Sequence, residues 1–559
     1  MTERAGSALL IATLLLFGFL NRTAYKGYFQ DDDLDTLSWA QVTPARIFLV
    51  GLLNPVAAPA NFRAVPAFYY HVIGASFGLD FPKYLIPLQA MHLLNICLLW
   101  LLLRKLGIGP LASSAGAFFF GLNAVVFDAW WKPMYVFDVL CCTFSLATLL
   151  LYACDRWILS LIAFWLAYKS KELAVMLPAV LVCYELWLGK RRWLRLLPFI
   201  VISLSWGLQA LIRNPGRGTA YELRLGFPAQ ATTIRFYATR LSRPPYAVAI
   251  LLLLPVLIRD RRLWFGFALT LLMLVPLLML PGRLFAVYWY VPLPGLAIML
   301  ATMADGRYRL AAAIFLLLWT PWDFFKFRHE QRDNLRLEAQ NRAYVTELAR
   351  FAKLNPAQRL FVYDGTPENF HWWGITGTVV CVNRVSGVRA LSIYDPGARA
   401  AVESGKAAWL HWQPAVSRLE IIEYSRAGQA PVPINAPMPP WQFLSGWFPF
   451  DEFPRWTQPD AAAELLRPEN AKYFEIAACV VPEQVRNRAK VHLRVLLNQS
   501  PLGDYEFTTP GCRNLRWPVP SELSGIAKVE FHIRPPFHPG NGDTRVLGMA
   551  VTGLGFTSE

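Results

Sequence analysis

Four carboxylates lie within five residues near the N-terminus, in the segment GYFQDDDLD at residues 27–35. Asp31, Asp32 and Asp33 are adjacent, and Asp35 follows two positions later. Carboxylates this close repel one another, and they lose solvation energy where lipid approaches. One interpretation is a solvated helix start, because aspartate favours caps and first turns. The other is a reactive site at the mouth of a membrane helix.

Further charged side chains fall on the same side of the membrane when the apolar runs are counted as spans. They are Arg63, Asp128, Lys132, Asp138, Lys169, Lys171, Glu172, Arg213, Arg217, Arg224, Arg235, Arg240, Arg243 and Arg283. A single cation there is typically an interfacial side chain that reaches the headgroups. Carboxylates and cations together fit a site for an anionic lipid headgroup and a hydroxyl. His92 and Asn95, within an apolar run, are expected to make helix–helix hydrogen bonds.

Transfer of a sugar from a polyprenyl phosphate is a reaction that such a site can run. The donor phosphate is a good leaving group, so it needs cations and no general acid. Arginine binds phosphate through two parallel hydrogen bonds, and lysine acts as a point charge. The acceptor hydroxyl needs a base, and a carboxylate on the face opposite the phosphate would invert the anomeric centre. A second carboxylate would orient the base, bind sugar hydroxyls or hold a divalent cation.

The elements that position these residues are predicted to be membrane helices. The chain has 559 residues, of which 55% are hydrophobic and 16% charged, and its mean hydropathy is +0.33. These values indicate a polytopic membrane protein. The net charge of +16 resides largely in short loops. No basic stripe with interleaved aromatics is present outside the membrane region, so nucleic acid is excluded as a partner.

Eleven apolar helices are predicted, with bounds uncertain by a few residues. Their ranges are 7–20, 84–103, 111–127, 136–153, 157–168, 173–188, 196–212, 246–258, 263–280, 284–303 and 310–325. The turns RK, DR, GKRRWLR, RDRR and DGRYR fall on one side, which is therefore cytoplasmic. The first helix is interpreted as a retained anchor with its N-terminus in the cytoplasm. The aspartates and the C-terminal region then face the extracytoplasmic side of the inner (plasma) membrane.

The predicted fold class is a polytopic α-helical membrane domain, residues 1–325, followed by two soluble parts. Residues 326–436 form a mixed α/β segment: an amphipathic helix, then strands in RLFVYDG, GTVVCVNR, VRALSIYD and RLEIIEYS. A Pro-rich linker, APVPINAPMPPW, marks a boundary near Ala436. Residues 437–559 alternate in polarity between turns and predict an antiparallel β-sandwich. Trp447 and Trp456 there either bind glycan or pack in the core.

Eight cysteines are present, without CxxC or Cys/His spacing typical of a metal site. Those in the apolar runs are interpreted as small hydrophobic residues. Cys479 and Cys512 fall in the predicted sandwich on the oxidising side, where pairing across neighbouring strands is allowed. Spacing alone does not decide whether they pair.

Four motifs, in order, resemble those of the GT-C glycosyltransferases, in particular the protein O-mannosyltransferase and lipid A aminoarabinose transferase-like branch. The first is the acidic FQDDDLD after helix one. The second is NFRAVPAFYY, then FGLDFPKY and HLLN; the third is SKELAVMLPAVLVCYEL; the fourth is RLFAVYWYVPLPGLA. The resemblance spans about residues 1–325. The run of three aspartates departs from the usual acidic pair, and DAWWKPMY lacks a clear second pair.

The resemblance implies a lipid-phosphate sugar donor and a catalytic Asp in the first extracytoplasmic loop. Carried over, the base is Asp32 or Asp33, and the donor phosphate meets Arg63, Lys171 and Arg283. Supporting residues are Asp31, Lys132, Asp138, Glu172, Tyr288 and Tyr290. No cofactor is certain; a divalent cation, Mg²⁺ or Mn²⁺, stays open, with Asp31, Asp32 and Asp33 as its ligands if one binds.

The sequence thus predicts an integral membrane inverting glycosyltransferase (a hexosyl- or pentosyltransferase). It would move a sugar from a polyprenyl-phosphate donor to a hydroxyl on a glycan, lipid or protein of the cell envelope. One alternative is a lipid or glycan transporter, which needs polar residues through the whole membrane. The other is a membrane-anchored carbohydrate-binding assembly protein, in which the aspartates are dispensable.

Overall fold

The structure, a computed structural model, describes residues 2–55, 63–213, 218, 220–224, 226–241, 249–385, 387–422, 432–433, 442–448, 454–467, 470–521, 525–540 and 543–558. The chain divides into two compact units. The first comprises Met1–Val345 and Glu368–Ser386, and the second comprises Thr346–Pro367 and Gly387–Glu559. The predicted domain division at residues 325 and 436 stays a prediction, and the Pro-rich linker lies almost wholly outside the described residues.

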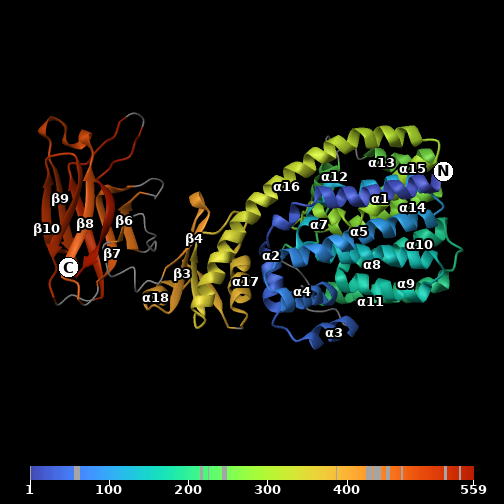
Figure 1. Ribbon diagram of the computed structural model, residues 1–559, viewed down its shortest axis with the longest axis horizontal. Coiled ribbons are helices and arrows are strands. Elements are labelled where there is room, and N and C mark those ends of the chain that lie inside the picture. Colours follow the sequence, from blue (N-terminus) through green and yellow to red (C-terminus); the bar gives the residue numbers. More distant parts are fainter. Residues whose placement is uncertain are drawn as a thin grey trace. The chain divides into compact units, whose positions relative to one another are not determined.

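The first unit is helical (Figure 1). Its helices are α1 (Thr2–Leu20), α2 (Asp31–Ala40), α3 (Ala45–Leu53), α4 (Ala64–Phe77), α5 (Phe81–Lys105), α6 (Pro110–Gly121), α7 (Asp128–Trp131), α8 (Val136–Ala153), α9 (Trp157–Ser170), α10 (Leu177–Trp187), α11 (Leu197–Arg213), α12 (Phe227–Leu241), α13 (Ile250–Ile258), α14 (Arg261–Leu278), α15 (Leu293–Asp305), α17 (Trp372–Asn383) and α16 (Arg309–Leu354), whose last residues, from Thr346 on, belong to the second unit. Short 3-10 helices join them, among them η1 (Ala24–Lys26), η2 (Ala124–Val126), η3 (Pro133–Tyr135), η4 (Glu172–Met176), η5 (Trp193–Leu196) and η7 (Ala286–Trp289).

Each of the eleven predicted apolar helices overlaps a helix of the structure. These are α1, α5, α6, α8, α9, α10, α11, α13, α14, α15 and α16. Among the described residues, five helices are long and apolar enough to cross a membrane: Glu3–Lys26, Phe81–Lys105, Pro133–Ala153, Arg261–Leu278 and Arg309–Leu354. Four shorter apolar helices are Pro110–Val126, Trp157–Ser170, Trp193–Gln209 and Leu293–Asp305. The number of crossings stays a prediction.

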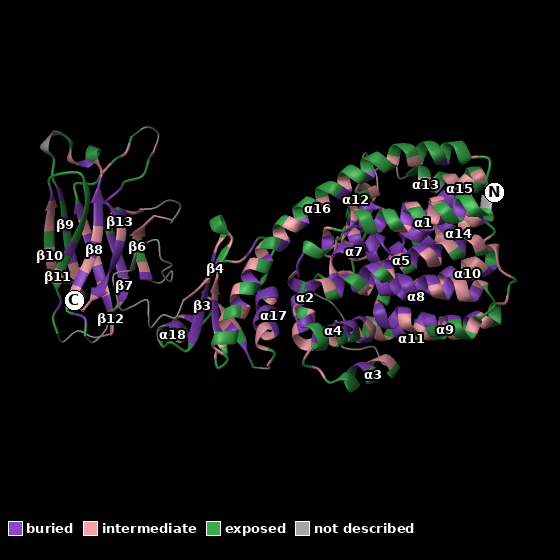
Figure 2. Ribbon diagram, in the orientation of Figure 1, coloured by how far each residue is buried: buried purple, intermediate pink, exposed green. Residues whose placement is uncertain are grey.

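The outer helix faces carry exposed aliphatic side chains, which is what a hydrocarbon surrounding favours. Leu15 of α1 and Leu317 and Leu318 of α16 are each at least 70% exposed. Figure 2 shows the same pattern, with exposed positions along the outer faces of α1 and α16 and buried positions inside the bundle. Inside, α8 packs against α5 and α9, and α6 packs against α1 and α15.

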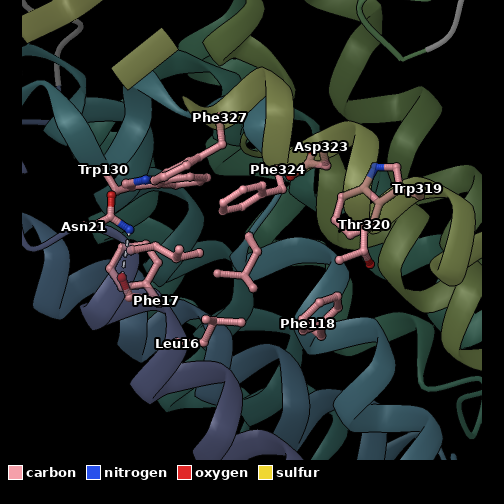
Figure 3. A pocket seen from close by; sticks show the side chains of 12 residues that line it. Leu16, Phe17, Asn21, Phe118, Trp130, Trp319, Thr320, Asp323, Phe324 and Phe327 are labelled. Atoms are coloured by element: carbon pink, nitrogen blue, oxygen red, sulfur yellow. Dashed lines mark hydrogen bonds between the residues drawn. The ribbon is translucent and has the colours of Figure 1, made fainter. Parts of the chain in front are cut away.

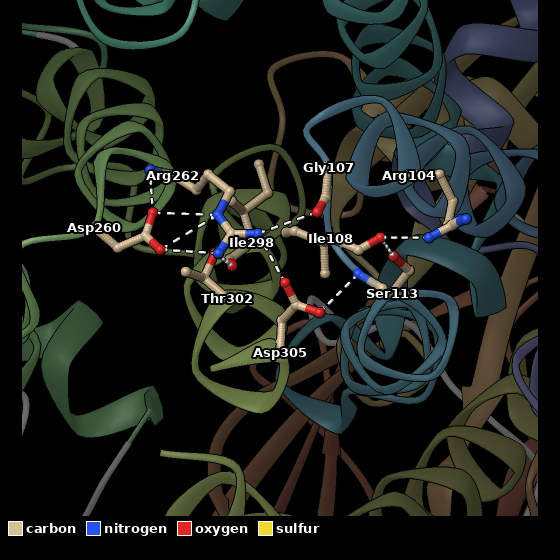
Figure 4. A network of polar contacts seen from close by, with 10 residues as sticks. Arg104, Gly107, Ile108, Ser113, Asp260, Arg262, Ile298, Thr302 and Asp305 are labelled. Carbon is tan, nitrogen blue, oxygen red and sulfur yellow. Dashed lines mark hydrogen bonds and ion pairs between the residues drawn. The ribbon is translucent and has the colours of Figure 1, made fainter. Parts of the chain in front are cut away.

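Polar contacts join three turns at one end of the bundle (Figure 4). The Arg262 guanidinium donates to Asp305 at 2.8 Å and to the Gly107 carbonyl at 3.3 Å. Asp305 also accepts from the Gly109 backbone N–H at 2.8 Å. Arg262 pairs with Asp260 as well. The basic turns after α5, before α14 and after α15 therefore meet at the same end, as the predicted sidedness requires.

Two elements differ from the prediction. The apolar helix at 310–325 and the amphipathic helix after it are one continuous helix, α16, which contains Pro321. The segment GTVVCVNR, predicted as a strand, lies in helix α17. Its β-branched residues favour a strand locally, but Gly374 and Gly377 let this segment pack closely on α2 as a helix. A Cβ at Gly377 would lie 2.6 Å from the Leu34 backbone.

The second unit contains two sheets. The first has the order β2-β1-β3-β4, with β1 (Leu360–Asp364) parallel to β2 (Arg389–Ser392) and to β3 (Ala407–Gln413), and β4 (Arg418–Ile422) antiparallel to β3. Helix α18 (Ala398–Glu403) lies in this part, and Val362, Val402 and Trp409 form its core. This agrees with the predicted mixed α/β segment, except that α17 replaces one predicted strand and that β3, which pairs with both β1 and β4, was not predicted.

The second sheet has nine strands, antiparallel throughout the described pairings. They are β5 (Val432–Pro433), β6 (Phe443–Trp447), β7 (Arg455–Arg467), β8 (Tyr473–Val480), β9 (Val491–Leu497), β10 (Ser500–Phe507), β11 (Gly511–Pro518), β12 (Gly525–Arg534) and β13 (Ala550–Thr557). The path is β10-β9-β12-β7-β13-β8-β11, so the long β7 joins two halves of one sheet. Phe474 of β8 contacts Phe531 of β12, so the halves enclose one core.

The structure resolves one open point of this part and bears on a second. Cys479 and Cys512 form a disulfide, because they lie directly opposite each other on β8 and β11. The Trp447 indole N–H donates to the Ala462 carbonyl at 2.8 Å, and its ring packs on Phe531. Trp447 therefore has a packing role. Trp456 is half-buried and stacks with Phe537.

Candidate functional site

The three aspartates occupy the first turn of α2, where the helix dipole favours negative charge. The Asp33 carboxylate accepts the backbone N–H of Gln30 at 2.9 Å, which caps the helix start. Consecutive residues of a helix point about 100° apart, so three adjacent aspartates meet three different surroundings. In the structure each of the three carboxylates contacts a different residue: His371, Trp373 or Tyr70.

Asp33 faces the interior and is fully buried. Its second oxygen accepts the Tyr70 hydroxyl of α4 at 2.6 Å. Burial raises the pKa of Asp33 to about 7, although the hydrogen bonds from Tyr70 and Gln30 oppose the shift. Both carboxylate oxygens of Asp33 are thus held by protein groups.

Asp31 is also buried and faces the start of α17. Its carboxylate accepts the His371 backbone N–H at 3.1 Å and pairs with the His371 ring Nδ1. Burial raises the pKa of Asp31 to about 6, while the hydrogen bonds from His371 act in the opposite direction. Asp31 therefore anchors α17 to α2.

Asp32 is exposed, unlike its two neighbours. The Trp373 indole N–H donates to its Oδ1 at 3.0 Å. The structure records no other hydrogen bond to this carboxylate from the described residues. Of the three adjacent aspartates, Asp32 alone therefore offers an oxygen to a bound molecule.

The predicted phosphate-binding cations lie near one another but differ in their partners. Arg63 makes a bidentate pair with Glu172, with both closest N–O distances at 2.9 Å. Lys171 pairs with the buried Asp138 at 2.5 Å. In both pairs a neighbouring carboxylate already balances the positive charge.

Arg283 is different, because no carboxylate among the described residues pairs with it. Its Nη2 donates to the Tyr288 hydroxyl at 3.4 Å, and its guanidinium lies over the rings of Tyr221 and Phe285. Its Nε–H is buried and makes no hydrogen bond to any of the described residues. The Lys171 ammonium lies 4.2 Å from the centre of the Tyr288 ring, so Tyr288 joins the two cations. Burial lowers the pKa of Arg283, whereas the Tyr288 and Tyr221 hydroxyls and, to a smaller extent, the Asp32 carboxylate raise it.

Of the remaining predicted supporting residues, Lys132 lies near Asp33, where its positive charge opposes the effect of burial on the pKa of that carboxyl, whereas Tyr290 lies in the bundle interior. Lys132 pairs with Asp128 at 2.9 Å. Tyr290 is fully buried, and its hydroxyl contacts His92 Nδ1 at 2.6 Å and the Asn95 amide at 3.1 Å. The predicted helix–helix hydrogen bonds of His92 and Asn95 are therefore confirmed.

The three aspartates do not form a metal site in this arrangement. No group of three His, Cys, Asp or Glu side chains with metal-site geometry occurs in the part of the chain that the structure describes. The carboxylates of Asp31 and Asp33 are directed at His371 and Tyr70, so they do not converge with that of Asp32. A divalent cation held by Asp31, Asp32 and Asp33 does not fit these residues.

A cavity of about 110 Å³ lies between the ends of α1 and α6 and the middle of α16 (Figure 3). Its walls are mostly apolar, with Phe17, Trp130, Trp319 and Phe327 among them. None of the aspartates or cations described above lines it, so this cavity is separate from the candidate site.

Sequence reasoning missed His371, Trp373 and Glu338 as parts of this region. His371 and Trp373 belong to the aromatic patch FHWWG, whose composition was a usable signal. Glu338 of α16 is buried and accepts the Trp131 indole N–H at 3.1 Å. In sequence it belongs to an ordinary charged helix, so no local signal identified it.

Comparisons with known proteins give a limited result. No family model and no curated protein matches this sequence. Among solved structures, the cryo-EM structure of the arabinofuranosyltransferase AftD from Mycobacteria is 13% identical, with a TM-score of 0.40 over 99% of this chain and 58% of that one. A mutant of AftD is 12% identical, with a TM-score of 0.37 over 99% of this chain and 61% of that one. This chain thus spans about three fifths of their length. Both TM-scores lie below 0.5, and the function proposed next is derived from this chain's own side chains.

Proposed function

We propose that this protein is an integral membrane inverting glycosyltransferase. It moves a sugar from a polyprenyl-phosphate donor to a hydroxyl group of an acceptor on the extracytoplasmic side. The observation that carries the proposal is an exposed carboxylate, Asp32, in the same region as Arg283, a guanidinium without an acidic partner among the described residues. The Asp32 carboxylate acts on the pKa of Arg283 less than burial and the Tyr288 and Tyr221 hydroxyls do, and the two residues form no ion pair among the described contacts. An apolar helix bundle that suits a lipid-linked donor supports them.

Asp32 is the proposed base. Its Oδ1 is held by Trp373, and Oδ2 is available to accept the proton of an acceptor hydroxyl. As that proton leaves, the acceptor oxygen forms a bond to the anomeric carbon. The bond between this carbon and the phosphate oxygen breaks, and its electron pair goes to the phosphate. Attack opposite the phosphate inverts the anomeric centre. The products are the glycoside, polyprenyl phosphate and a proton on Asp32.

Arg283 is the proposed contact for the donor phosphate. Its buried Nε–H has no hydrogen-bond acceptor in the part of the chain that the structure describes, and a buried donor left without a partner costs about 1–3 kcal/mol. A phosphate oxygen would satisfy this donor and neutralise the charge. Lys171 lies over the Tyr288 ring, but its pair with Asp138 already balances its charge, so Arg283 is the principal proposed contact. Arg63 and Glu172 balance each other's charge in a bidentate ion pair, and we propose that this pair holds α4 against η4.

The test is a transfer assay on the full-length protein in lipid nanodiscs. Polyprenyl-phosphate-linked pentoses and hexoses are supplied one at a time with oligosaccharide acceptors, and mass spectrometry detects polyprenyl phosphate and extended acceptor. We expect one donor to be consumed by the wild type, and Arg283→Ala to raise the donor KM. Substrate flux across proteoliposomes without any covalent product would contradict the proposal and favour a transporter.

A further inference from the structure

The start of α17 places three consecutive rings beside the proposed base. His371 and Trp373 stack with centroids 4.4 Å apart and ring planes 5° from parallel. Trp372 meets Trp373 edge-on at 5.8 Å. Trp372 is 64% exposed, and the His371 side chain is 55% exposed. Aromatic side chains with this exposed fraction are unusual on a helix whose other face packs closely against α2.

The backbone under these rings is fixed on its buried side. Asp31 holds His371 through both the backbone N–H and the ring. Gly374 sits against the Asp31 carboxylate, where a Cβ would clash, and Gly377 sits against the α2 backbone. The exposed rings therefore project from a rigid support and lose little conformational freedom when a ligand binds.

We infer that His371, Trp372 and Trp373 form the binding subsite for a saccharide acceptor, an inference that rests on the proposed function. Sugar rings present faces of C–H groups with partial positive charge, which pack well on the negative face of an aromatic ring. Their hydroxyl groups need polar partners at the ring edge. The exposed Trp372 ring provides the first kind of contact, and the Asp32 carboxylate, connected to it through Trp373, provides the second.

Trp373 links the two parts of the subsite. Its indole N–H fixes Asp32 Oδ1 at 3.0 Å while its ring supports His371. A sugar that stacks on the exposed rings would direct a hydroxyl toward the remaining oxygen of Asp32. Trp373 is thus a positioning residue for the base, and Trp372 is a contact for the acceptor. A Ser/Thr peptide acceptor would gain little from an open ring face.

The experiment uses hexasaccharides of arabinofuranose, mannopyranose and glucopyranose, each tested separately with the full-length protein in nanodiscs. Transfer kinetics give the acceptor and donor KM, and calorimetry gives hexasaccharide binding without any donor. Trp372→Ala is expected to raise the acceptor KM and the hexasaccharide Kd about tenfold, the scale of one lost aromatic contact. The donor KM keeps its value, and Trp372→Phe restores most of the acceptor affinity.

The matched control is Trp193→Ala, which removes another exposed tryptophan, on η5. It should leave acceptor and donor KM unchanged. Transfer by Trp372→Ala with a wild-type acceptor KM would overturn the inference, as would transfer to Ser/Thr peptides but to none of the saccharides. If the wild type transfers no sugar from any donor, the proposed function fails; calorimetry then still decides whether the rings bind saccharide.

Discussion

At the scale of single residues, three adjacent aspartates acquire three different roles from helix geometry. Asp31 is bound to His371, Asp33 to Tyr70 and Gln30, and Asp32 alone is open. The sequence indicated that one of Asp32 and Asp33 is the base, but it did not distinguish them. The distinction depends on Tyr70 and Trp373, which are 37 and 341 residues away from their aspartates.

Asp32→Asn is expected to lower kcat for sugar transfer about 10²- to 10⁴-fold, because an amide does not accept the acceptor proton. The measurement is the initial rate in nanodiscs, with thermal unfolding as the check that the variant folds. Asp35→Asn is the matched control, since Asp35 is also exposed on α2 and should retain most of the activity. Equal losses in the two variants would remove Asp32 from its proposed role.

Asp33 is expected to make the stability of the first unit depend on pH. It ionises near 3.8 in an unfolded chain but near 7 when buried. The unfolded state therefore loses its proton first, and the free energy of unfolding falls as pH rises from about 4 to about 7. Asp33→Asn lacks this contribution. The Tm of the variant relative to wild type should therefore rise from pH 4.5 to pH 7.5.

Asp31 titrates in both proteins, so its effect cancels in this difference. A Tm difference that stays constant over this range would show that Asp33 is ionised in the folded protein. That outcome would also return Asp33 to the set of candidate bases.

At the scale of elements, the apolar helices could be predicted from sequence because each carries its own signal of length and composition. The same holds for the strands of the second unit, which alternate in polarity. Helix α17 could not be predicted, because its valines favour a strand and only its packing on α2 favours a helix. This error matters for the site, since α17 carries Trp373 and begins directly after His371.

The contact between α2 and α17 is expected to be intolerant of a single methyl group. Gly377→Ala places a Cβ 2.6 Å from the Leu34 carbonyl carbon, and backbone on both sides must shift. We expect a loss of about 1–3 kcal/mol in stability and a fall in transfer, since the shift moves Trp373 relative to Asp32. Thermal unfolding and kcat in nanodiscs measure the two effects.

Gly18→Ala in α1 is the control, because a Cβ there meets no atom within 4 Å. This substitution should leave stability unchanged or raise it slightly, as alanine favours a helix over glycine. A Gly377→Ala protein as stable and active as Gly18→Ala would show that α17 does not determine the position of Asp32.

At the scale of the whole molecule, the orientation of the helix bundle in the membrane determines on which side the proposed site lies. The basic turns that meet at Arg262 lie at one end of the bundle, and Lys171 pairs with Asp138 in the first turn of α8. The Cys479–Cys512 disulfide is of the kind that persists in oxidising compartments, which agrees with the predicted extracytoplasmic C-terminal region. Orientation in the membrane itself stays a prediction.

Cys154 provides a test of that orientation. It caps the end of α8 opposite Asp138, and a helix of 18 residues spans about 27 Å. Cys154 is exposed, whereas the other free cysteines are buried or half-buried. If the basic turns are cytoplasmic, a membrane-impermeant maleimide should label Cys154 in inverted vesicles and not in intact cells, and Cys154→Ser should abolish the signal. Labelling from outside would place Asp32 and Arg283 in the cytoplasm, and a donor presented on the outer leaflet would then never reach them.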